Sequence, residues 1–308
     1  MTDTVADSPV VIYVAGSGRN GSTFLGLQLE RSPQFFFAGE LTHVWQRGCL
    51  DNELCGCGQP FHDCEFWTTV IDKAFGRFTA ADAKQAVQLR NRVSNFRRLP
   101  SLLWRRTTVG LATAQDYGRL YVPLVRAISE VSGCSYVVDS SKYPTDLSGL
   151  LQLSELDLRV LHLVRNCNAV VHSWKRQKPR TEIHWKHQLM PRYGAIQTAL
   201  GWKVFNRAIA RLTSECGDRY RRVRYEDLTT EFDCSMASLL AWLGLPDTDV
   251  SGRFQRASHS VGGNPCRFQF NSQEVRQDDE WRQSMTKLDR LTVRMLCGTD
   301  QQQMGYER

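Results

Sequence analysis

The sequence has no long apolar run and no recognisable secretion signal. Its longest apolar runs are short segments such as VVIYVAG at residues 10–16, far below the roughly 18 apolar residues that a membrane-spanning helix needs. The first residues, MTDTVADSPV, carry acidic side chains and no basic stretch, unlike a secretory signal peptide. From these absences we expect a cytoplasmic protein without an integral membrane segment.

The sequence also has no block of like charge, although it is basic overall. Lys and Arg total 39 against 32 Asp and Glu, a formal net charge of +7. No basic region is regularly interleaved with aromatic residues, and the arginines are scattered beside glycines and at the ends of apolar runs. This distribution favours a small polyanionic ligand over a nucleic-acid partner.

Internal repeats and low-complexity tracts are missing as well. With 308 residues, 42% of them hydrophobic, the chain is long enough to bury one sizeable core. We therefore predict a single domain over residues 8–300, with flexible termini at 1–7 and 301–308. The sequence leaves open whether the domain forms a homodimer.

Short apolar runs alternate with helical patterns along the chain. Runs rich in Val, Ile, Leu or Tyr predict buried strands at residues 10–15, 135–139, 158–164 and 220–225. Helical spacing of apolar residues predicts helices at 22–31, 81–97, 114–131, 144–154, 167–176, 194–215 and 234–243. The alternation predicts an α/β fold, with a central parallel sheet and helices on both faces. Residues 177–192, with two prolines, are expected to form a mobile loop, and the polar tail after about 275 a short helix.

The segment GSGRNGST, residues 16–23, lacks the lysine that its spacing would lead one to expect. Gly16 and Gly21 match the phosphate-binding loop G-x-x-x-x-G-K-[ST], but Ser22 stands where that loop has lysine. A glycine turn that opens a helix still directs backbone N–H groups and a positive dipole end at one point. Arg19 adds a cation, and Ser22 and Thr23 add hydroxyl donors. Without the lysine, ATP or GTP hydrolysis is disfavoured and a shorter anion is favoured.

Two further segments combine cations with donors for anions. In RVLHLVRNCNAVVHSWKR, Arg165 ends an apolar strand and Ser173 lies about two turns into the next helix. The carboxyl ends of parallel strands share one crevice, so Arg165 should lie near the glycine loop. In HSVGGNPCRFQF, the paired glycines 262 and 263 stand beside Asn264 and Arg267, typical of a backbone-amide nest with a cation.

Four of the ten cysteines lie in one segment, CLDNELCGCGQPFHDCEFW. These are Cys49, Cys55, Cys57 and Cys64, with His62 among them. The spacing C-x-C-x6-C is not a standard zinc spacing, and nothing indicates an oxidising compartment. Buried or partly buried thiols are the favoured interpretation, with a structural zinc and a disulfide as the alternatives.

Together, these segments resemble the sulfotransferase family that uses 3′-phosphoadenosine 5′-phosphosulfate (PAPS) as donor, and two of them resemble segments of a bacterial branch. GSGRNGSTF resembles its 5′-phosphosulfate loop, LVRNCNAVVHSW its 3′-phosphate site, and VRYEDL a segment whose aromatic residue lies near the adenine. The resemblance implies a P-loop NTPase-like sulfotransferase fold, PAPS as donor, 3′,5′-ADP (PAP) as product and no required metal. The residues expected to bind the donor are Gly18, Arg19, Asn20, Gly21, Ser22, Thr23, Arg165, Ser173, Tyr225, Gly263, Asn264 and Arg267.

The same resemblance assigns catalytic roles. Glu40, which follows a short aromatic strand in FFFAGELTHVW, matches a glutamate that acts as base in a tyrosyl-protein branch, and His43 is the competing base. Lys142 in YVVDSSKYP matches a lysine that stabilises the transferring group, and Arg19 is the second cation. Asp139 is expected to be a structural hydrogen-bond acceptor rather than a base.

The acceptor is less defined than the donor. The loop at 177–192 mixes Arg, Lys and His with Trp185, which could stack on a ring. These residues do not define one acceptor class, and the hydroxyl acceptor is expected to be a small molecule, a carbohydrate or a lipid. Two rival interpretations are a P-loop kinase or NTPase and a nucleotide-binding protein without catalytic activity.

Overall fold

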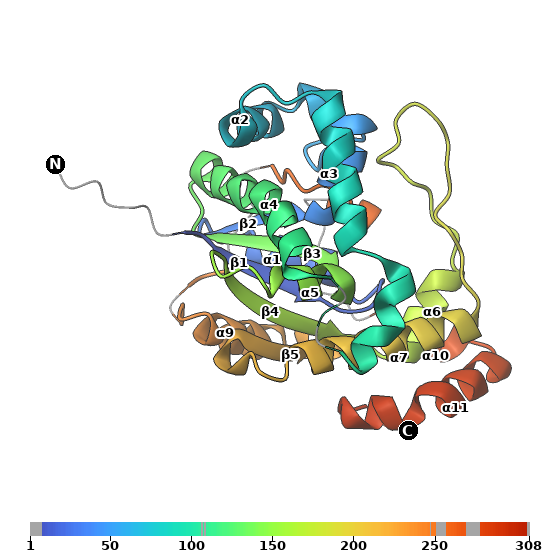
Figure 1. The fold of residues 1–308 in the computed structure, drawn as a ribbon. Coiled ribbons are helices and arrows are strands. Elements are labelled where there is room, and N and C mark those ends of the chain that lie inside the picture. The colour runs from blue at the N-terminus through green and yellow to red at the C-terminus, as the bar shows by residue number, and fades with distance from the viewer. Residues whose placement is uncertain are drawn as a thin grey trace.

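The structure is a computed structural model that describes residues 8–105, 107, 109–246, 248–250, 257–268 and 278–306. A five-stranded sheet forms its centre (Figure 1). Across the sheet the strands are β2 (Phe35–Gly39), β3 (Tyr136–Lys142), β1 (Val10–Ala15), β4 (Asp157–Val164) and β5 (Tyr220–Arg224). Every pairing is parallel, which confirms the predicted strands and their orientation.

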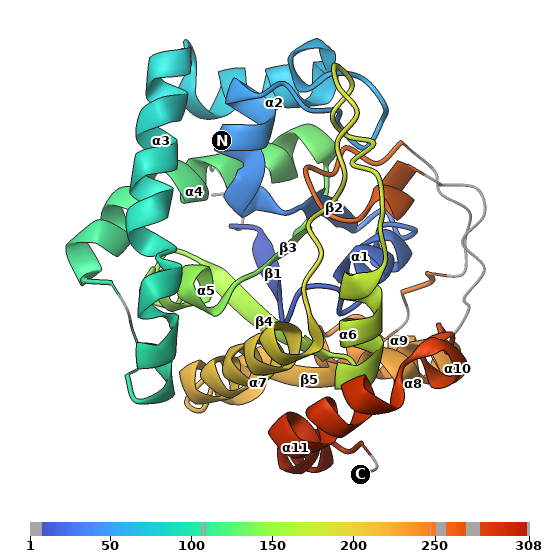
Figure 2. The same ribbon diagram turned by 90° about the vertical axis from the view of Figure 1, so that its right-hand side faces the viewer.

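Helices cover both faces of the sheet, as predicted for an α/β fold (Figures 1 and 2). They include α1 (Ser22–Leu29), α3 (Ala80–Val93), α4 (Leu111–Ser132), α5 (Pro144–Leu150), α7 (Ala195–Leu212) and α9 (Phe232–Trp242). On one face, Val11 and Tyr13 of β1 join the core formed with α3, α4 and α7. On the other face, Ile12 and Val14 join the core formed with α1 and α9. Because successive side chains of a strand point to opposite faces, the apolar run of β1 serves both cores.

Two described helices lie outside the sequence predictions. They are α2 (Glu65–Phe75) and α8 (Tyr225–Thr230). In α2 the run Thr68–Ile71 contains residues that are branched at Cβ and weaken the helical signal, and the helix is stabilised by burial of Trp67 and Val70. Short helical turns occur at Leu41–His43, Val44–Leu50, Phe61–Asp63, Phe96–Leu103, Gly217–Arg219 and Pro265–Phe268.

The C-terminal part of the chain is more extensively packed than predicted. It contains α10 (Trp281–Ser284) and α11 (Lys287–Gln303), and α11 packs against α7 and α6 (Cys167–Lys175). Beyond it, the hydroxyl of the buried Tyr306 donates to Glu226 Oε2 at 2.7 Å and lies 3.2 Å from the Val164 carbonyl. The predicted boundary at residue 300 is therefore too early, and residues 301–306 are not a loose terminus. Residues 1–7 and 307–308 lie outside the described residues.

Residues 177–192 form two antiparallel segments rather than the expected mobile loop. Pro179 pairs with Leu189, and backbone hydrogen bonds join Arg180 to Gln188 and Met190 to Lys178. Figure 2 shows this excursion extending from α6 towards α2. Arg180 of this segment pairs with the buried Glu53 and Glu182, as described below, and local sequence patterns do not reveal these pairs. Within the described ranges, no helix is both long enough and apolar enough to span a membrane.

Candidate active site

The glycine loop connects β1 to α1 at the carboxyl edge of the sheet. Gly21 has a φ of 96°, and a Cβ atom there would lie 2.2 Å from the ring of Tyr225. Asn20 is fully buried; its Nδ2 donates to the Leu163 carbonyl at 3.0 Å, and its Oδ1 accepts from the Ser22 N–H at 3.2 Å. The asparagine thus fixes the loop on β4, while glycine is needed where the tyrosine ring approaches the backbone.

Arg19 has a left-handed backbone, with a φ of 67°, and is partly buried. Its guanidinium lies 4.7 Å from the centre of the Trp174 ring, and its Nη2 donates to Met190 Sδ at 2.9 Å. The Trp174 ring also covers Gly18, where a Cβ atom would lie 2.7 Å from it. Trp174 and Met190 therefore border the glycine loop, although the sequence analysis did not single them out. Trp174 directly follows Ser173 and could have been found there.

Arg165 lies beside the glycine loop, as predicted from the shared edge of the sheet. Its Nη1 donates to the Arg19 carbonyl at 3.2 Å, and its guanidinium lies 4.4 Å from the centre of the Tyr225 ring. Its Nη2 also forms an ion pair with Asp278 Oδ2 at 3.1 Å, a partner that the sequence did not suggest. Ser173 is buried in the second turn of α6, the helix that follows β4.

The nest at residues 262–264 also reaches the glycine loop. Gly262 and Gly263 have φ values of 65° and 94°, and the Asn264 N–H donates to Thr23 Oγ1 at 3.2 Å. Arg267 is 1% exposed, and its guanidinium donates to the carbonyl groups of Ser260 and Leu54. These two contacts give Arg267 a role in supporting the loop, and its role in binding the donor stays a prediction.

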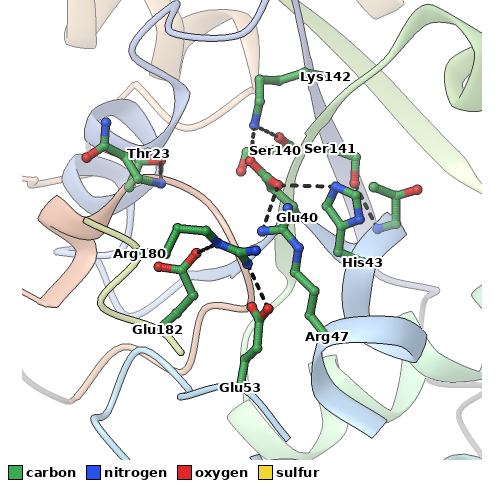
Figure 3. A network of polar contacts seen from close by, with 12 residues as sticks. Thr23, Glu40, His43, Arg47, Glu53, Ser140, Ser141, Lys142, Arg180 and Glu182 are labelled. Atoms are coloured by element: carbon green, nitrogen blue, oxygen red, sulfur yellow. Dashed lines mark hydrogen bonds and ion pairs between the residues drawn. The ribbon is translucent and has the colours of Figure 1, made fainter. Parts of the chain in front are cut away.

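Glu40 and Lys142 form a buried ion pair at the same edge of the sheet (Figure 3). Lys142 Nζ lies 2.5 Å from Glu40 Oε1 and donates to the Ser140 carbonyl at 2.6 Å. Burial alone would raise the pKa of Glu40, but Lys142, the largest of the opposing charges, helps lower it from 4.5 to about 2. A Cβ atom on Gly262 would lie 3.3 Å from Glu40 Oε2, and one on Gly263 would lie 3.2 Å from Thr23 Oγ1, so the nest adjoins both side chains. The two predicted catalytic side chains thus adjoin the predicted anion loops.

His43, the competing base, lies on the other side of the Glu40 carboxylate. Its Nε2 is 3.5 Å from Glu40 Oε2, and Arg47 Nη1 is 3.9 Å from the same oxygen. Burial and the Arg47 charge hold the pKa of His43 well below its usual value of 6.5, so the imidazole is neutral at pH 7. Figure 3 shows these three side chains converging on one point.

Asp139 has the structural surroundings that the sequence analysis expected. It accepts hydrogen bonds from the Tyr121 hydroxyl at 2.8 Å and from the N–H groups of Ser141 and Leu41 at 2.9 and 3.3 Å. Burial raises its pKa to about 6 despite these contacts. It therefore joins α4, β3 and the turn after β2.

The excursion at 177–192 is attached near the ion pair by a second charged group. Arg180 pairs with Glu53 Oε1 at 2.7 Å and with Glu182 Oε1 at 2.8 Å, and the Leu54 N–H donates to the Glu182 carbonyl at 2.9 Å. The Glu53 N–H donates to the Arg47 carbonyl at 2.8 Å, which connects this group to the residues around Glu40. Figure 3 draws both groups. Trp185 is 49% exposed. The sequence analysis noted the mixed charge of this segment but did not identify Arg180 and its partners.

Comparisons with known proteins agree with this architecture. Residues 9–249 match the model of the Sulfotransferase family. The sulfotransferase domain of the Synechococcus PCC 7002 olefin synthase is 19% identical, with 100% of this chain and 99% of that chain covered and a TM-score of 0.53. A sulfotransferase domain from the curacin biosynthetic pathway is 16% identical, with 97% and 98% covered and a TM-score of 0.53. At these identities the two structures show a shared fold alone. Comparison with curated proteins found no match.

Proposed function

This chain belongs to the sulfotransferase family, and we propose that it transfers a sulfuryl group from PAPS to a hydroxyl group of a small-molecule, carbohydrate or lipid acceptor. The observation that carries the proposal is the contact between Arg165 Nη1 and the Arg19 carbonyl at 3.2 Å. It brings together two candidate anion sites, one at the end of β1 and one at the end of β4. PAPS carries a phosphosulfate at one end and a separate phosphate on its 3′ oxygen, so it requires two such sites.

The residues around the loop fit an anionic nucleotide. Ser17 Oγ, Arg19 Nε and Arg165 Nε are buried and have no hydrogen-bond partner within the part of the chain that is described. Buried donors of this kind are costly unless they are paired, and phosphate or sulfate oxygens would satisfy them. The rings of Trp174 and Tyr225 beside the loop supply flat apolar surfaces of the kind that a purine base can contact.

The Glu40–Lys142 pair can divide the chemistry of sulfuryl transfer. We assign Lys142, together with Arg19, to the oxygens on which negative charge grows as the bond between sulfur and its bridging oxygen breaks. We assign Glu40 to the acceptor hydroxyl, whose proton it takes as the new sulfur–oxygen bond forms in line. Lys142 is the largest charge that lowers the pKa of Glu40. When Lys142 interacts with the donor instead, the pKa of the buried Glu40 carboxylate rises, and the carboxylate becomes a stronger base.

Nucleotide binding tests the donor assignment. In a thermal-shift titration we expect 3′,5′-ADP to raise the melting temperature, because a ligand that binds only the folded state stabilises it. ATP with Mg²⁺ should have a smaller effect, since Ser22 replaces the lysine of the nucleotide-triphosphate loop. If ATP with Mg²⁺ stabilises the protein and millimolar 3′,5′-ADP does not, a kinase or NTPase takes the place of this proposal.

Two variants distinguish an enzyme from a protein that only binds the nucleotide. Glu40→Gln and Lys142→Ala should retain affinity for 3′,5′-ADP and lose sulfation of acceptors in a screen with labelled PAPS. Sulfation that persists in Glu40→Gln would move the base to His43. Binding of the nucleotide without turnover on any acceptor class in the wild type would favour the non-catalytic alternative.

A further inference from the structure

Three sulfur atoms and one imidazole nitrogen gather beside the start of α2. Cys64 Sγ lies 3.6 Å from Cys55 Sγ, 3.8 Å from Cys57 Sγ and 3.2 Å from His259 Nδ1. Cys55 Sγ is 3.7 Å from the same nitrogen, and all four atoms lie within 4.8 Å of one another. The sequence placed His62 and Cys49 among these sulfurs, but His62 Nε2 instead contacts the Cys49 carbonyl at 3.0 Å. The fourth group comes from a residue about two hundred positions away.

Three of these four separations, 3.6, 3.7 and 3.8 Å, match the edges of a tetrahedral metal site, and the fourth, 3.2 Å between Cys64 Sγ and His259 Nδ1, is shorter. With Zn–S near 2.3 Å and Zn–N near 2.0–2.1 Å, tetrahedral angles place neighbouring ligand atoms about 3.6–3.8 Å apart. A disulfide would require two sulfurs about 2.05 Å apart, whereas the nearest pair is separated by 3.6 Å. The set of three thiols and one imidazole suits zinc, since thiolates and imidazole are its preferred ligands.

The surroundings hold each ligand in place. A tight turn forms the Cys55–Gln59 segment, with the Cys55 N–H donating to the Gln59 carbonyl at 2.8 Å. The His259 ring stacks on Phe66, with centroids 4.8 Å apart, and its carbonyl accepts from Trp67 Nε1 at 2.7 Å. Residues of α2 therefore orient the histidine towards the sulfurs.

A positive charge also lies close to this cluster. Three thiolates and a neutral imidazole around Zn²⁺ carry a net charge of −1. The fully buried Arg267 guanidinium donates to the carbonyl of Leu54, the residue before Cys55, at 2.8 Å. A buried guanidinium beside a net negative cluster reduces the cost of burying either charge alone.

We propose that Cys55, Cys57, Cys64 and His259 bind one structural Zn²⁺ that attaches the segment 257–268 to the turn before α2. Four protein ligands fill a tetrahedral site and leave no open position for a substrate, so the metal serves the fold rather than the chemistry. This departs from the expectation from sequence that favoured unligated thiols and placed no metal-binding residue in the chain.

The attached segment continues directly into the candidate active site. Two residues after His259, Val261 accepts from the Glu40 N–H at 2.6 Å and donates to the Ala38 carbonyl at 2.9 Å. The nest that contacts Thr23 follows at once. A metal at His259 would therefore position the backbone that borders both Glu40 and the glycine loop, and its loss should loosen that backbone.

Metal analysis of the full-length protein tests the site. We expect about one zinc per chain in the wild type, and loss of that zinc in Cys64→Ser and His259→Asn. Cys49→Ser and His62→Asn are the matched controls, because they change the same residue types in the same segment outside the cluster, and they should keep the metal. A wild type without zinc after preparation in zinc-containing medium overturns the proposal. So does zinc loss that is equal in the controls and the cluster variants.

Measurements on the wild type cover the case in which the cluster variants do not fold. Zinc removal by a chelator should lower the melting temperature and expose three additional thiols to a labelling reagent, and zinc should restore both. Cobalt in place of zinc should give the visible absorption of a tetrahedral thiolate site. Mass spectrometry of the denatured, alkylated chain without reductant should show all ten cysteines modified. Two unmodified cysteines that map to this cluster would identify a disulfide and overturn the proposal. None of these measurements requires sulfation, so they test the zinc site independently of the proposed function.

Discussion

Replacing Glu40 with glutamine leaves the Lys142 ammonium without its carboxylate partner. The folded state lowers the pKa of Glu40 from 4.5 to about 2. At about 1.4 kcal/mol per pH unit, this difference corresponds to roughly 3 kcal/mol of folding free energy above pH 4.5. Because the folded pKa is the lower one, this stabilisation is complete above the unfolded pKa and is lost as the pH falls towards 2. At pH 3.5 about 2 kcal/mol should remain.

The assay compares the free energies of unfolding of the wild type and Glu40→Gln in urea at pH 7 and pH 3.5. We expect the wild type to be more stable than Glu40→Gln by roughly 3 kcal/mol at pH 7. At pH 3.5 this difference should fall to about 2 kcal/mol. Other carboxylates titrate in both proteins and cancel in the difference. A difference that stays constant between the two pH values would refute the reasoning.

Glu53→Gln is the matched control for this experiment. Glu53 is also paired with an arginine, at 2.7 Å, but burial raises its pKa above 4.5. With a raised pKa in the folded state, the wild type should gain stability relative to this variant as the pH falls. The two variants should therefore show pH trends of opposite sign, and trends of the same sign would show that the pH effect is not specific to Glu40.

Three further predictions concern the nucleotide loop. Arg165→Ala should weaken binding of 3′,5′-ADP by about 1.5–3 kcal/mol, roughly ten- to a hundredfold, as for a lost charge-assisted contact; an unchanged dissociation constant by calorimetry would contradict this. Asp278→Asn should tighten the same binding several-fold, because it removes the carboxylate that lies 3.1 Å from Arg165; weaker binding would show that Asp278 supports the site. Gly21→Ala should lower the melting temperature more than Gly76→Ala, since both glycines have positive φ but only at Gly21 does a Cβ atom meet the Tyr225 ring. If both alanine variants lower the melting temperature equally, backbone strain accounts for the whole effect and the contact with the Tyr225 ring contributes nothing.

Local features of the sequence were enough to predict the sheet and the loops at its edge. The β1 and β4 strands are buried on both faces, so their apolar runs are continuous and easily found. The glycine loop and Arg165 each follow a strand, Lys142 is the last residue of β3, and parallel strands carry their carboxyl ends to one edge. The predicted nearness of Arg19 and Arg165 followed from that rule and is seen in the structure.

Tertiary structure alone decided which side chains meet. Glu40 and Lys142 are 102 residues apart, Arg165 and Asp278 are 113 apart, and Cys64 and His259 are 195 apart. Helices and strands leave a periodic trace because their hydrogen bonds and buried faces recur every few residues. A contact between distant segments leaves no such trace, since it depends on how loops close over the finished sheet. That is why the sequence indicated a zinc site only as one alternative for the cysteines and showed only His62 among them, whereas the fold brings His259 to them.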